Sequence, residues 1–504
     1  MLSFQEIGFR YTGAEEPALV DVSFAVEPGA YVVLLGANGS GKSTLARLAN
    51  ALLLPDTGHV EVDGLRADER ATLRTVRGLV GVVAQDPDNQ IISATVLDDA
   101  AFGPENLGLP RDEITRRCAE ALATVGLLGF EERDPNTLSG GEKQRLVIAG
   151  VLAMDPSYLV LDEPTSMLDS EGRAEVLAAI NALRARGHGI LHITHDLDYA
   201  HDADKLLVLQ AGRLVFEGAP DTLLQDEEKL IAYALQVGSG DVTPRQSPCQ
   251  PRPLAPPDPS LPSLLLRDVA YTYSAGASFA HDALKGADLT VAAGSYTLIS
   301  GHTGSGKSTL LRIAAGLLVP TSGTTGFSDG SAVTPGTVGI VFQHPEVQLF
   351  AQTVGEDILF GPRNLKMDTT GIVDSVLAAV GLEPRRFAQR SPFTLSGGEM
   401  RRVAIASILA MRSRFLLLDE PTAGLDAQGR AFVHRLIDEL VRQGTGVVVV
   451  SHDLSEFVSR AHVHLLLQKG RLYVAGGGAG AGSTAKAGGS AVSATGHLHV
   501  AGGA

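Results

Sequence analysis

The segment Gly36-Ala37-Asn38-Gly39-Ser40-Gly41-Lys42-Ser43 follows the apolar run Tyr31–Leu35 and precedes Thr44. A buried strand that opens through glycines into a helix can bind anions, because the N–H groups of the turn and the helix N-terminus point at one place. Lys42 can reach the β- and γ-phosphates of a nucleotide, and the Ser43 hydroxyl can hold a bridging Mg²⁺. The segment therefore predicts a phosphate-binding loop.

The same pattern returns as Gly301-His302-Thr303-Gly304-Ser305-Gly306-Lys307-Ser308, followed by Thr309. One such match could be a plain glycine turn, but two matches, each between a predicted strand and a predicted helix, favour nucleotide binding. The rest of the chain repeats with them, which indicates a tandem duplication. We expect two domains, 1–237 and 263–475, joined by the proline-rich linker 238–262 and followed by a Gly/Ala-rich disordered tail, 476–504.

Short apolar runs alternate with helical stretches in each copy. Runs that are continuously apolar, rather than apolar at every second position, are typical of parallel strands covered by helices on both faces. Each copy then ends in a hairpin. The expected strands are residues 80–84, 158–161, 190–194, 206–209 and 214–216 in the first copy, and 338–342, 415–418, 447–450, 465–467 and 472–474 in the second. The fold class is therefore α/β, with a mostly parallel sheet in each domain.

Composition limits the classes of partner. The chain has 504 residues and a net charge of −16, whereas proteins that bind nucleic-acid backbones usually carry a basic excess, so we expect no nucleic acid as partner. Cys118 and Cys249 share no metal-ligand spacing, which favours a reducing compartment. No leader pattern stands at the N-terminus and no apolar run approaches the roughly 20 residues that span a bilayer. Any membrane role is expected to depend on a partner.

Adjacent carboxylates end one predicted strand in each copy, as Asp162-Glu163 and Asp419-Glu420. The carboxyl ends of parallel strands are where α/β sheets bind ligands. We expect Asp162 and Asp419 to orient Mg²⁺, and Glu163 and Glu420 to polarise a water for attack on the γ-phosphate. The alternative is a carboxylate that only caps the following turn.

Two further helix starts carry a serine and two glycines, Leu138-Ser139-Gly140-Gly141-Glu142 and Leu395-Ser396-Gly397-Gly398-Glu399. An isolated Ser-Gly-Gly is more often an ordinary helix cap. Here both occurrences lie shortly before the carboxylate-bearing strand, and the sequence resembles the ATP-binding cassette family, whose signature motif these residues match. The resemblance implies two tandem P-loop NTPase domains, each with a helical signature subdomain, that bind and hydrolyse ATP with Mg²⁺.

The resemblance assigns roles to four further pairs of residues. It implies that an aromatic ring stacks on adenine, that a glutamine reaches Mg²⁺ and the attacking water, that a histidine contacts the γ-phosphate, and that an aspartate lies where the cassettes touch. A half-buried strand tyrosine and a structural histidine remain the alternatives for the first and third roles. In the same order, the pairs are Tyr11 and Tyr273, Gln85 and Gln343, His195 and His452, and Asp169 and Asp426.

In this family the two cassettes pair head to tail. Each ATP then lies between the phosphate loop of one copy and the signature helix of the other, so Gly36–Ser43 would be completed by residues 396–398, and residues 301–308 by residues 139–141. Neither copy has lost a glutamate or a signature residue. We therefore expect two sites competent in hydrolysis.

A more specific resemblance follows Gln85 and Gln343, where both copies contain Phe-Gly-Pro-x-Asn-Leu. This region is similar to the energy-coupling factor ATPases, which drive uptake of vitamins and of cobalt or nickel ions. The resemblance implies a transmembrane coupling subunit, a substrate-binding membrane subunit and a place on the cytoplasmic face of the cell membrane. Acidic residues would bind arginines of the coupling subunit, although most acidic clusters are only solvated. These are Asp86, Asp88, Asp98, Asp99 and Glu105, with Glu346, Glu356 and Asp357 in the second copy.

Two other classes of tandem-cassette protein remain open. A protein acting on ribosomes would share the loops and signatures, but it would be expected to have a long charged linker and basic patches. A sugar-importer ATPase would have a similar length, but its second half is usually degenerate.

Overall fold

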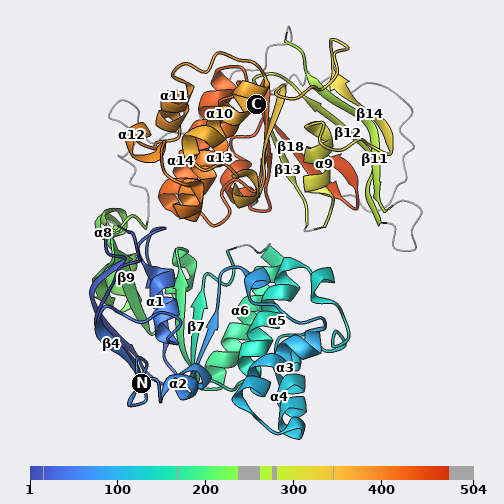
Figure 1. Cartoon of the computed structure of the whole chain (residues 1–504). Helices are drawn as coiled ribbons and strands as arrows, with labels where there is room; N and C mark the ends of the chain where they lie inside the picture. The colour runs from blue at the N-terminus through green and yellow to red at the C-terminus, as the bar shows by residue number, and fades with distance from the viewer. Residues whose placement is uncertain are drawn as a thin grey trace, which may run out of the picture.

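The computed structural model describes residues 1–14, 16–166, 168, 170–235, 261–274, 281–302, 304–343 and 345–475 (Figure 1). The described residues form two α/β units, the first over 1–235 and the second over 261–475, which face each other in Figure 1. The predicted tail lies outside the described residues, as does the predicted linker apart from its last two residues.

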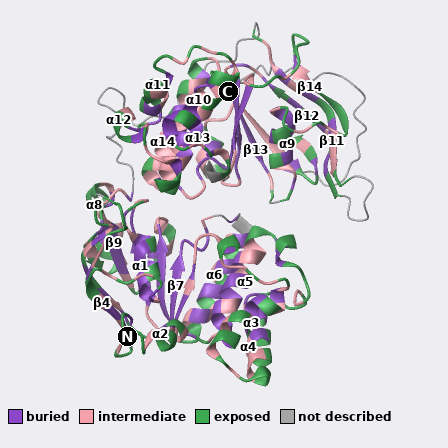
Figure 2. Cartoon of the chain, in the orientation of Figure 1, coloured by how far each residue is buried: buried purple, intermediate pink, exposed green. Residues whose placement is uncertain are grey.

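A six-stranded sheet forms the centre of the first unit. Its strand order is β10-β9-β3-β8-β7-β6, and all neighbours are parallel except the final hairpin of β9 with β10. Strands β3, β7 and β8 are buried along their whole length, because helices cover both faces (Figure 2). The bounds are β3 Tyr31–Leu35, β6 Val80–Val83, β7 Tyr158–Asp162, β8 Gly189–Thr194, β9 Lys205–Gln210 and β10 Arg213–Gly218. The prediction of a mostly parallel sheet is confirmed.

An antiparallel sheet of four strands, which the sequence reading did not predict, packs beside the central sheet. Its order is β2-β1-β4-β5, with β1 Leu2–Phe9, β2 Leu19–Val26, β4 Thr57–Val62 and β5 Leu65–Arg66. Apolar side chains from both sheets and from helix α1, Lys42–Ala49, share one core that includes Phe4, Leu34 and Leu45. The phosphate loop therefore lies between two packed sheets.

Helices complete the first unit. Helices α3, α4 and α5 pack together as a helical subdomain at one end of the central sheet (Figure 1). The bounds are α2 Leu73–Leu79, α3 Val96–Leu107, α4 Arg111–Thr124, α5 Gly140–Ala153, α6 Ser170–Ala185, α7 Pro220–Leu224 and α8 Glu227–Ala232, with 3-10 turns at Pro87–Asn89, Pro135–Thr137 and Leu197–Ala200.

The second unit repeats this plan. Its central sheet has the order β15-β16-β17-β13-β18-β19, and its antiparallel sheet the order β12-β11-β14. Among the described residues no helix lies between β14 and β15, where the first unit has α2. The strands are β11 Leu264–Tyr273, β12 His281–Val291, β13 Tyr296–Ser300, β14 Ser322–Phe327, β15 Val338–Val341, β16 Phe415–Asp419, β17 Gly446–Val450, β18 Val463–Gln468 and β19 Arg471–Val474. The helices are α9 Lys307–Ala314, α10 Val354–Asn364, α11 Ile372–Ala379, α12 Pro384–Phe387, α13 Gly397–Leu409, α14 Ala427–Arg442 and α15 Leu454–Phe457, with 3-10 turns at Pro345–Gln348 and Pro392–Thr394.

Candidate ATP sites between the two units

Each phosphate loop joins a buried strand to a helix, as predicted. Gly41 precedes α1 with φ 106°, and a Cβ there would lie 2.6 Å from the carbonyl oxygen of Ala18, so only glycine fits. The Lys42 ammonium is buried and donates to the carbonyl oxygens of Gly36 at 2.7 Å and Ala37 at 3.0 Å. Burial lowers the pKa of Lys42. An anion in the loop would satisfy this buried charge.

The second loop has the same geometry. Gly306 precedes α9 with φ 102°, and Lys307 Nζ donates to the carbonyl oxygens of Gly301 at 2.6 Å and His302 at 2.9 Å. Thr303, predicted to belong to this loop, lies outside the described residues. The described part of the loop is therefore a second anion site of the same design.

The two tyrosines predicted to stack on adenine are partly exposed at the rim of a cavity next to the loops. Tyr11 Oη lies 3.1 Å from Thr44 Oγ1, and Tyr273 Oη lies 3.1 Å from Thr309 Oγ1. These hydrogen bonds hold each ring beside the first turn of the helix that follows the loop. The prediction that the rings stack on adenine remains a prediction.

The aspartates at the ends of β7 and β16 are buried. Burial raises the pKa of Asp162 to about 6, although a hydrogen bond from Ser43 opposes the shift. Asp162 Oδ1 has no hydrogen-bond partner among the described residues. Burial also raises the pKa of Asp419, with Ser308 as the opposing donor. A buried carboxylate oxygen with no donor, beside a hydroxyl, fits a hard divalent cation such as Mg²⁺.

Glu163 and Glu420 follow these aspartates in a backbone conformation that non-glycine residues rarely adopt. Their φ angles are 49° and 48°. The Glu163 amide donates to the carbonyl of Ile193 at 2.9 Å, which ties the strained residue to the neighbouring strand. Strain of this kind is kept where the surrounding structure holds it, often at functional sites.

A histidine lies against each glutamate. His195 Nδ1 is 3.0 Å from Glu163 Oε2, and His452 Nδ1 is 3.0 Å from Glu420 Oε2. Burial raises the pKa of Glu163, but the hydrogen bond from His195 and the nearby charges of His195 and Lys42 together outweigh burial and hold this pKa below its ordinary value. Glu163 therefore stays ionised and can accept a hydrogen bond from water.

Gln85 and Gln343 follow β6 and β15 and both line the cavity. Gln85 Nε2 donates to Ser166 Oγ at 3.4 Å, and the carbonyl oxygen of Gln343 accepts from Arg401 at 2.7 Å. Both glutamines therefore line the same cavity as the phosphate loops, but their hydrogen-bond partners differ between the two units.

The signature serines cap their helices, which was the plainer alternative for them. Ser139 Oγ accepts from the Glu142 amide at 3.3 Å and the Glu142 carboxylate accepts from the Ser139 amide at 2.7 Å. Ser396 and Glu399 form the same capping box. Capping leaves the helix start open to an anion, because Ser396, Gly397 and Gly398 all line the cavity, as does Gly140 in the first unit.

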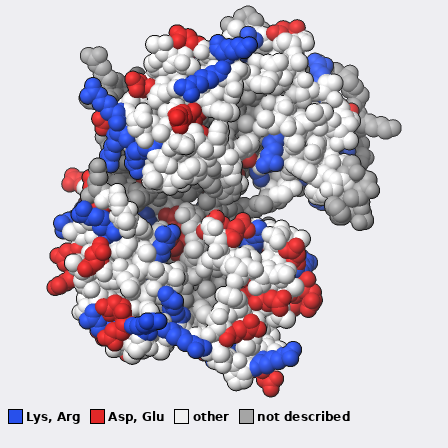
Figure 3. All heavy atoms as spheres, viewed as in Figure 1, with Lys and Arg blue, Asp and Glu red and all other residues white. Residues whose placement is uncertain are grey.

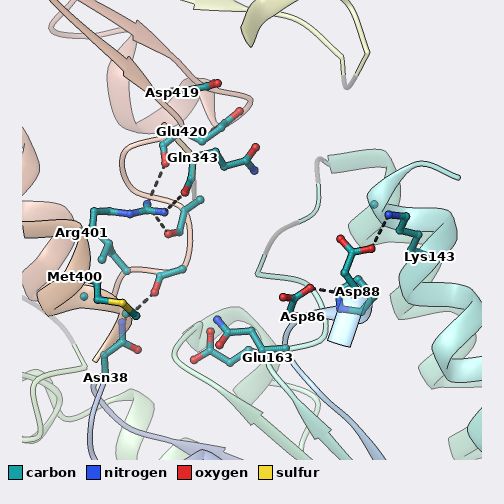
Figure 4. Close-up of a pocket in the computed structure, with 18 of the residues that line it drawn as sticks. Asn38, Asp86, Asp88, Lys143, Glu163, Gln343, Met400, Arg401, Asp419 and Glu420 are labelled. Atoms are coloured by element: carbon teal, nitrogen blue, oxygen red, sulfur yellow. Dashed lines mark hydrogen bonds and ion pairs between the residues drawn. The ribbon is translucent and has the colours of Figure 1, made fainter. Parts of the chain in front are cut away.

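One cavity of about 990 Å³ lies between the units and takes residues from both phosphate loops and both signature helices (Figure 4). The first loop touches the second unit directly: the Asn38 amide donates to Asp426 Oδ2 at 2.9 Å, and Asn38 Nδ2 donates to the carbonyl of Gly424 at 2.9 Å. Asp169, the counterpart of Asp426, lies outside the described residues. The first loop therefore faces the second signature helix.

A family model described as ABC transporter matches residues 19–166 and 284–423, more than half of the chain. The chain belongs to the ABC transporter family. A candidate ABC transporter ATP-binding protein of Bifidobacterium longum is 37% identical over 90% of this chain, which spans 63% of that relative's length. A candidate HMP/thiamine import ATP-binding protein of Bacillus subtilis is 32% identical over 93% of this chain and 90% of its own length. An energy-coupling factor transporter ATP-binding protein of Symbiobacterium thermophilum is 52% identical over 44% of this chain and 77% of its own length.

The two units are thus ABC cassettes, and the chain is an ATP-binding, ATP-hydrolysing subunit of an ABC transporter. No helix in the described ranges has the length and apolarity needed to cross a bilayer. Figure 3 shows basic groups in separate patches between acidic ones on the face drawn.

Two of the acidic residues that were expected to bind a partner, Asp99 and Asp357, are buried, one in each cassette. Asp99 is buried and accepts from the amides of Ile92 and Ser93, at 2.9 and 3.1 Å. Asp357 is buried and accepts from the amides of Phe350 and Ala351, at 3.3 and 3.1 Å. The interpretation is wrong for this pair, because both carboxylates hold a loop and do not face solvent.

The remaining acidic residues differ in what they contact. Asp88 forms an ion pair with Lys143 at 2.5 Å, and Asp86 caps the turn that contains Asp88 (Figure 4). The side chain of Glu346 lies outside the described residues. Asp98, Glu105 and Glu356 are exposed.

Arg401 lines the cavity but was not among the expected site residues, whereas Asn38 was expected and makes a further contact with the second unit. Arg401 was overlooked because it follows the signature residues on α13, where a charged residue usually faces solvent. Asn38 was assigned only to the phosphate loop. The one sequence signal for its second role was the Ala-Gly-Leu-Asp segment that ends at Asp426, where the cassettes were expected to touch.

Proposed function

We propose that this chain is the ATP-hydrolysing subunit of an energy-coupling factor importer, with domains at 1–237 and 263–475 that share two composite ATP sites. The observation that carries the proposal is the Phe-Gly-Pro-x-Asn-Leu segment of each cassette, which lies at the C-terminal end of α3 and of α10. The similarity to an energy-coupling factor transporter ATP-binding protein over 44% of the chain, and to a cobalt import ATP-binding protein over 46% of it, supports the proposal.

An apolar groove accompanies this segment in the first cassette. It has a volume of about 660 Å³ and is lined by Ile92, Phe102 and Met154, together with arginines of α2 and other residues of α3. Ile92 is 61% exposed and Phe102 47% exposed. In the second cassette the corresponding Phe350 and Phe360 are also exposed, with ring centroids 4.7 Å apart. Exposed apolar patches of this kind suit a protein partner, here the transmembrane coupling subunit.

ATP hydrolysis in this proposal follows from the residues around each loop. The backbone N–H groups and Lys42 bind the phosphate chain, and the second signature helix closes over it. Glu163 holds and polarises the attacking water, while His195 keeps the Glu163 carboxylate oriented and ionised. Ser43, Gln85 and Asp162 would hold Mg²⁺, which when bound neutralises charge on the β- and γ-phosphates. Ser308, Gln343 and Asp419 would do the same in the second cassette.

Closure and reopening of the cassettes would move the segments after Gln85 and Gln343, and with them the membrane partner. The cargo in this proposal is a vitamin, a vitamin precursor or a cobalt or nickel ion, carried by a separate substrate-binding membrane subunit. The chain would then work at the cytoplasmic face of the membrane.

The test is isolation of the tagged chain from detergent-solubilised membranes, with identification of the proteins that accompany it. Two membrane proteins, a coupling subunit and a substrate-binding subunit, are expected. Ile92→Asp should release both without loss of ATP hydrolysis by the purified chain. Charge reversal at Asp86 and Asp88 should also release both. Leu128→Asp is the matched control, because Leu128 is also 61% exposed but does not line the groove. Sedimentation of the chain with ribosomes instead of membranes would contradict the proposal.

A further inference from the structure

The Arg401 side chain occupies an unusual place for a charged residue on a signature helix. It is only 5% exposed, and Nη1 donates to the carbonyl oxygens of Glu420 at 3.1 Å, Pro421 at 3.1 Å and Ala423 at 2.7 Å. Nη2 donates to the carbonyl oxygen of Gln343 at 2.7 Å. One guanidinium thus joins α13 to the main chain on both sides of the second site (Figure 4).

The first cassette has different contacts at the positions that correspond to Arg401 and Ala423. Gln144 stands at the matching position, and its Nε2 lies 3.5 Å from the carbonyl oxygen of Ala84. Ser166 replaces Ala423, and its hydroxyl donates to the carbonyl of Glu163 at 3.1 Å and accepts from Gln85 at 3.4 Å. A single neutral hydroxyl therefore joins the glutamine to the carboxylate loop in this cassette.

The two arrangements differ in strength. Hydrogen bonds from a charged donor are stronger than neutral ones, and a planar guanidinium fixes several acceptors at once. Glu420 needs such support because its φ of 48° is strained. Both glutamate carbonyls accept from a backbone amide, that of Ala423 at 3.2 Å for Glu420 and that of Ser166 at 3.2 Å for Glu163. The Glu420 carbonyl accepts in addition from the charged Arg401 guanidinium, whereas the Glu163 carbonyl, at φ 49°, accepts in addition from the neutral Ser166 hydroxyl.

We propose that Arg401 is a positioning residue that fixes Glu420 and Gln343 for attack on the γ-phosphate, and that it makes the second ATP site turn over faster than the first. The proposal rests on the proposed roles of Glu163 and Glu420 in hydrolysis, and it is independent of the membrane partners. Arg401 lies on α13, whose N-terminus faces the first phosphate loop. Its hydrogen bonds therefore also connect that helix, which belongs to the first site, to Gln343 and Glu420 of the second site.

The test measures ATP turnover of the full chain with one site silenced at a time. Glu163→Gln leaves the site of Glu420, and Glu420→Gln leaves the site of Glu163. In the Glu163→Gln background, Arg401→Gln should lower kcat about tenfold with KM for ATP changed less than about twofold, since a misplaced water affects chemistry more than binding. Arg401→Lys should recover part of the loss.

An exchange of the corresponding residues between the two cassettes controls for a variant that fails to fold. Arg401→Gln together with Ala423→Ser should bring the second site to the rate of the first. Gln144→Arg together with Ser166→Ala, in the Glu420→Gln background, should raise kcat of the first site several-fold.

Two results would overturn the proposal. The first is an unchanged kcat for Arg401→Gln in the Glu163→Gln background, and the second is an equal fall in both backgrounds. If Arg401→Gln does not fold, the variant with Gln144→Arg and Ser166→Ala provides the test. An unchanged kcat of the first site in that variant also overturns the proposal. Unchanged turnover in both parent variants would instead contradict the assigned roles of the two glutamates.

Discussion

The backbone amide of Asn38 in the first cassette donates a hydrogen bond of 2.9 Å to the carboxylate of Asp426 in the second. The Asn38 side chain adds a second bond, to the carbonyl of Gly424. These contacts hold the first phosphate loop against the segment that follows β16. The cavity beside the first phosphate loop, a candidate ATP site, is therefore lined by both halves of the chain.

Ser396→Arg should impair the site of Lys42 before the site of Lys307, because Ser396 starts the helix that faces the first loop. The measurement is vanadate trapping of a photoreactive ATP analogue, followed by mapping of the labelled peptides. Ser139→Arg is the matched variant and should show the reverse order. Loss of label at Lys307 alone in Ser396→Arg would contradict the cross-cassette pairing.

Glu163→Gln and Glu420→Gln should each lower ATP turnover without abolishing it, and the double variant should retain less than about 1% of the rate. The reason is that each glutamate has a phosphate loop, an aspartate and a histidine of its own cassette beside it. Steady-state phosphate release by the purified chain measures this. The two-site interpretation fails if one change leaves the rate untouched and the other removes it.

His192 should make the first cassette sensitive to acid. Burial lowers its pKa to about 4, and Tyr31 Oη lies 2.7 Å from His192 Nδ1. The unfolded chain binds the proton more readily, so the free energy of unfolding should fall as pH drops from about 6.5 to 4, by an amount on the order of 3 kcal/mol.

The second cassette supplies the matched variant for this prediction. Val449 takes the place of His192 in the sheet, and Tyr296 Oη has no hydrogen-bond partner among the described residues. His192→Val should therefore flatten the pH dependence of urea unfolding between pH 6.5 and 4. An unchanged slope would show that other groups cause it.

Asp99→Ala should destabilise the first cassette by about 1–2 kcal/mol, because it leaves the partly buried amides of Ile92 and Ser93 without their acceptor. Asp98→Ala, at the exposed neighbour, should change the free energy of unfolding by less than about 0.5 kcal/mol. Denaturant unfolding of the full chain measures both. Equal effects of the two changes would contradict the loop-holding role of Asp99.

The central sheets could be predicted because their strands are short, continuously apolar and bounded by turn residues. The antiparallel sheets could not. In β2, buried positions alternate with more exposed ones only over residues 22–26, because the positive φ of Asp21 interrupts the pattern, and its partner β1 is chosen by packing against α1 and the central sheet. The acidic residues after Gln85 and Gln343 show the same limit, since nothing local distinguishes buried Asp99 from exposed Asp98.

The sequence by itself determined the two phosphate loops, the carboxylates at the strand ends and the capped signature helices, because glycine torsions, strand ends and helix caps depend on neighbouring residues. Only the tertiary structure decided that Asn38 contacts Asp426, that Glu163 and Glu420 are held with positive φ, and that Arg401 points inward at four carbonyl groups. Such contacts join residues from separate elements, and they arise from how the elements pack.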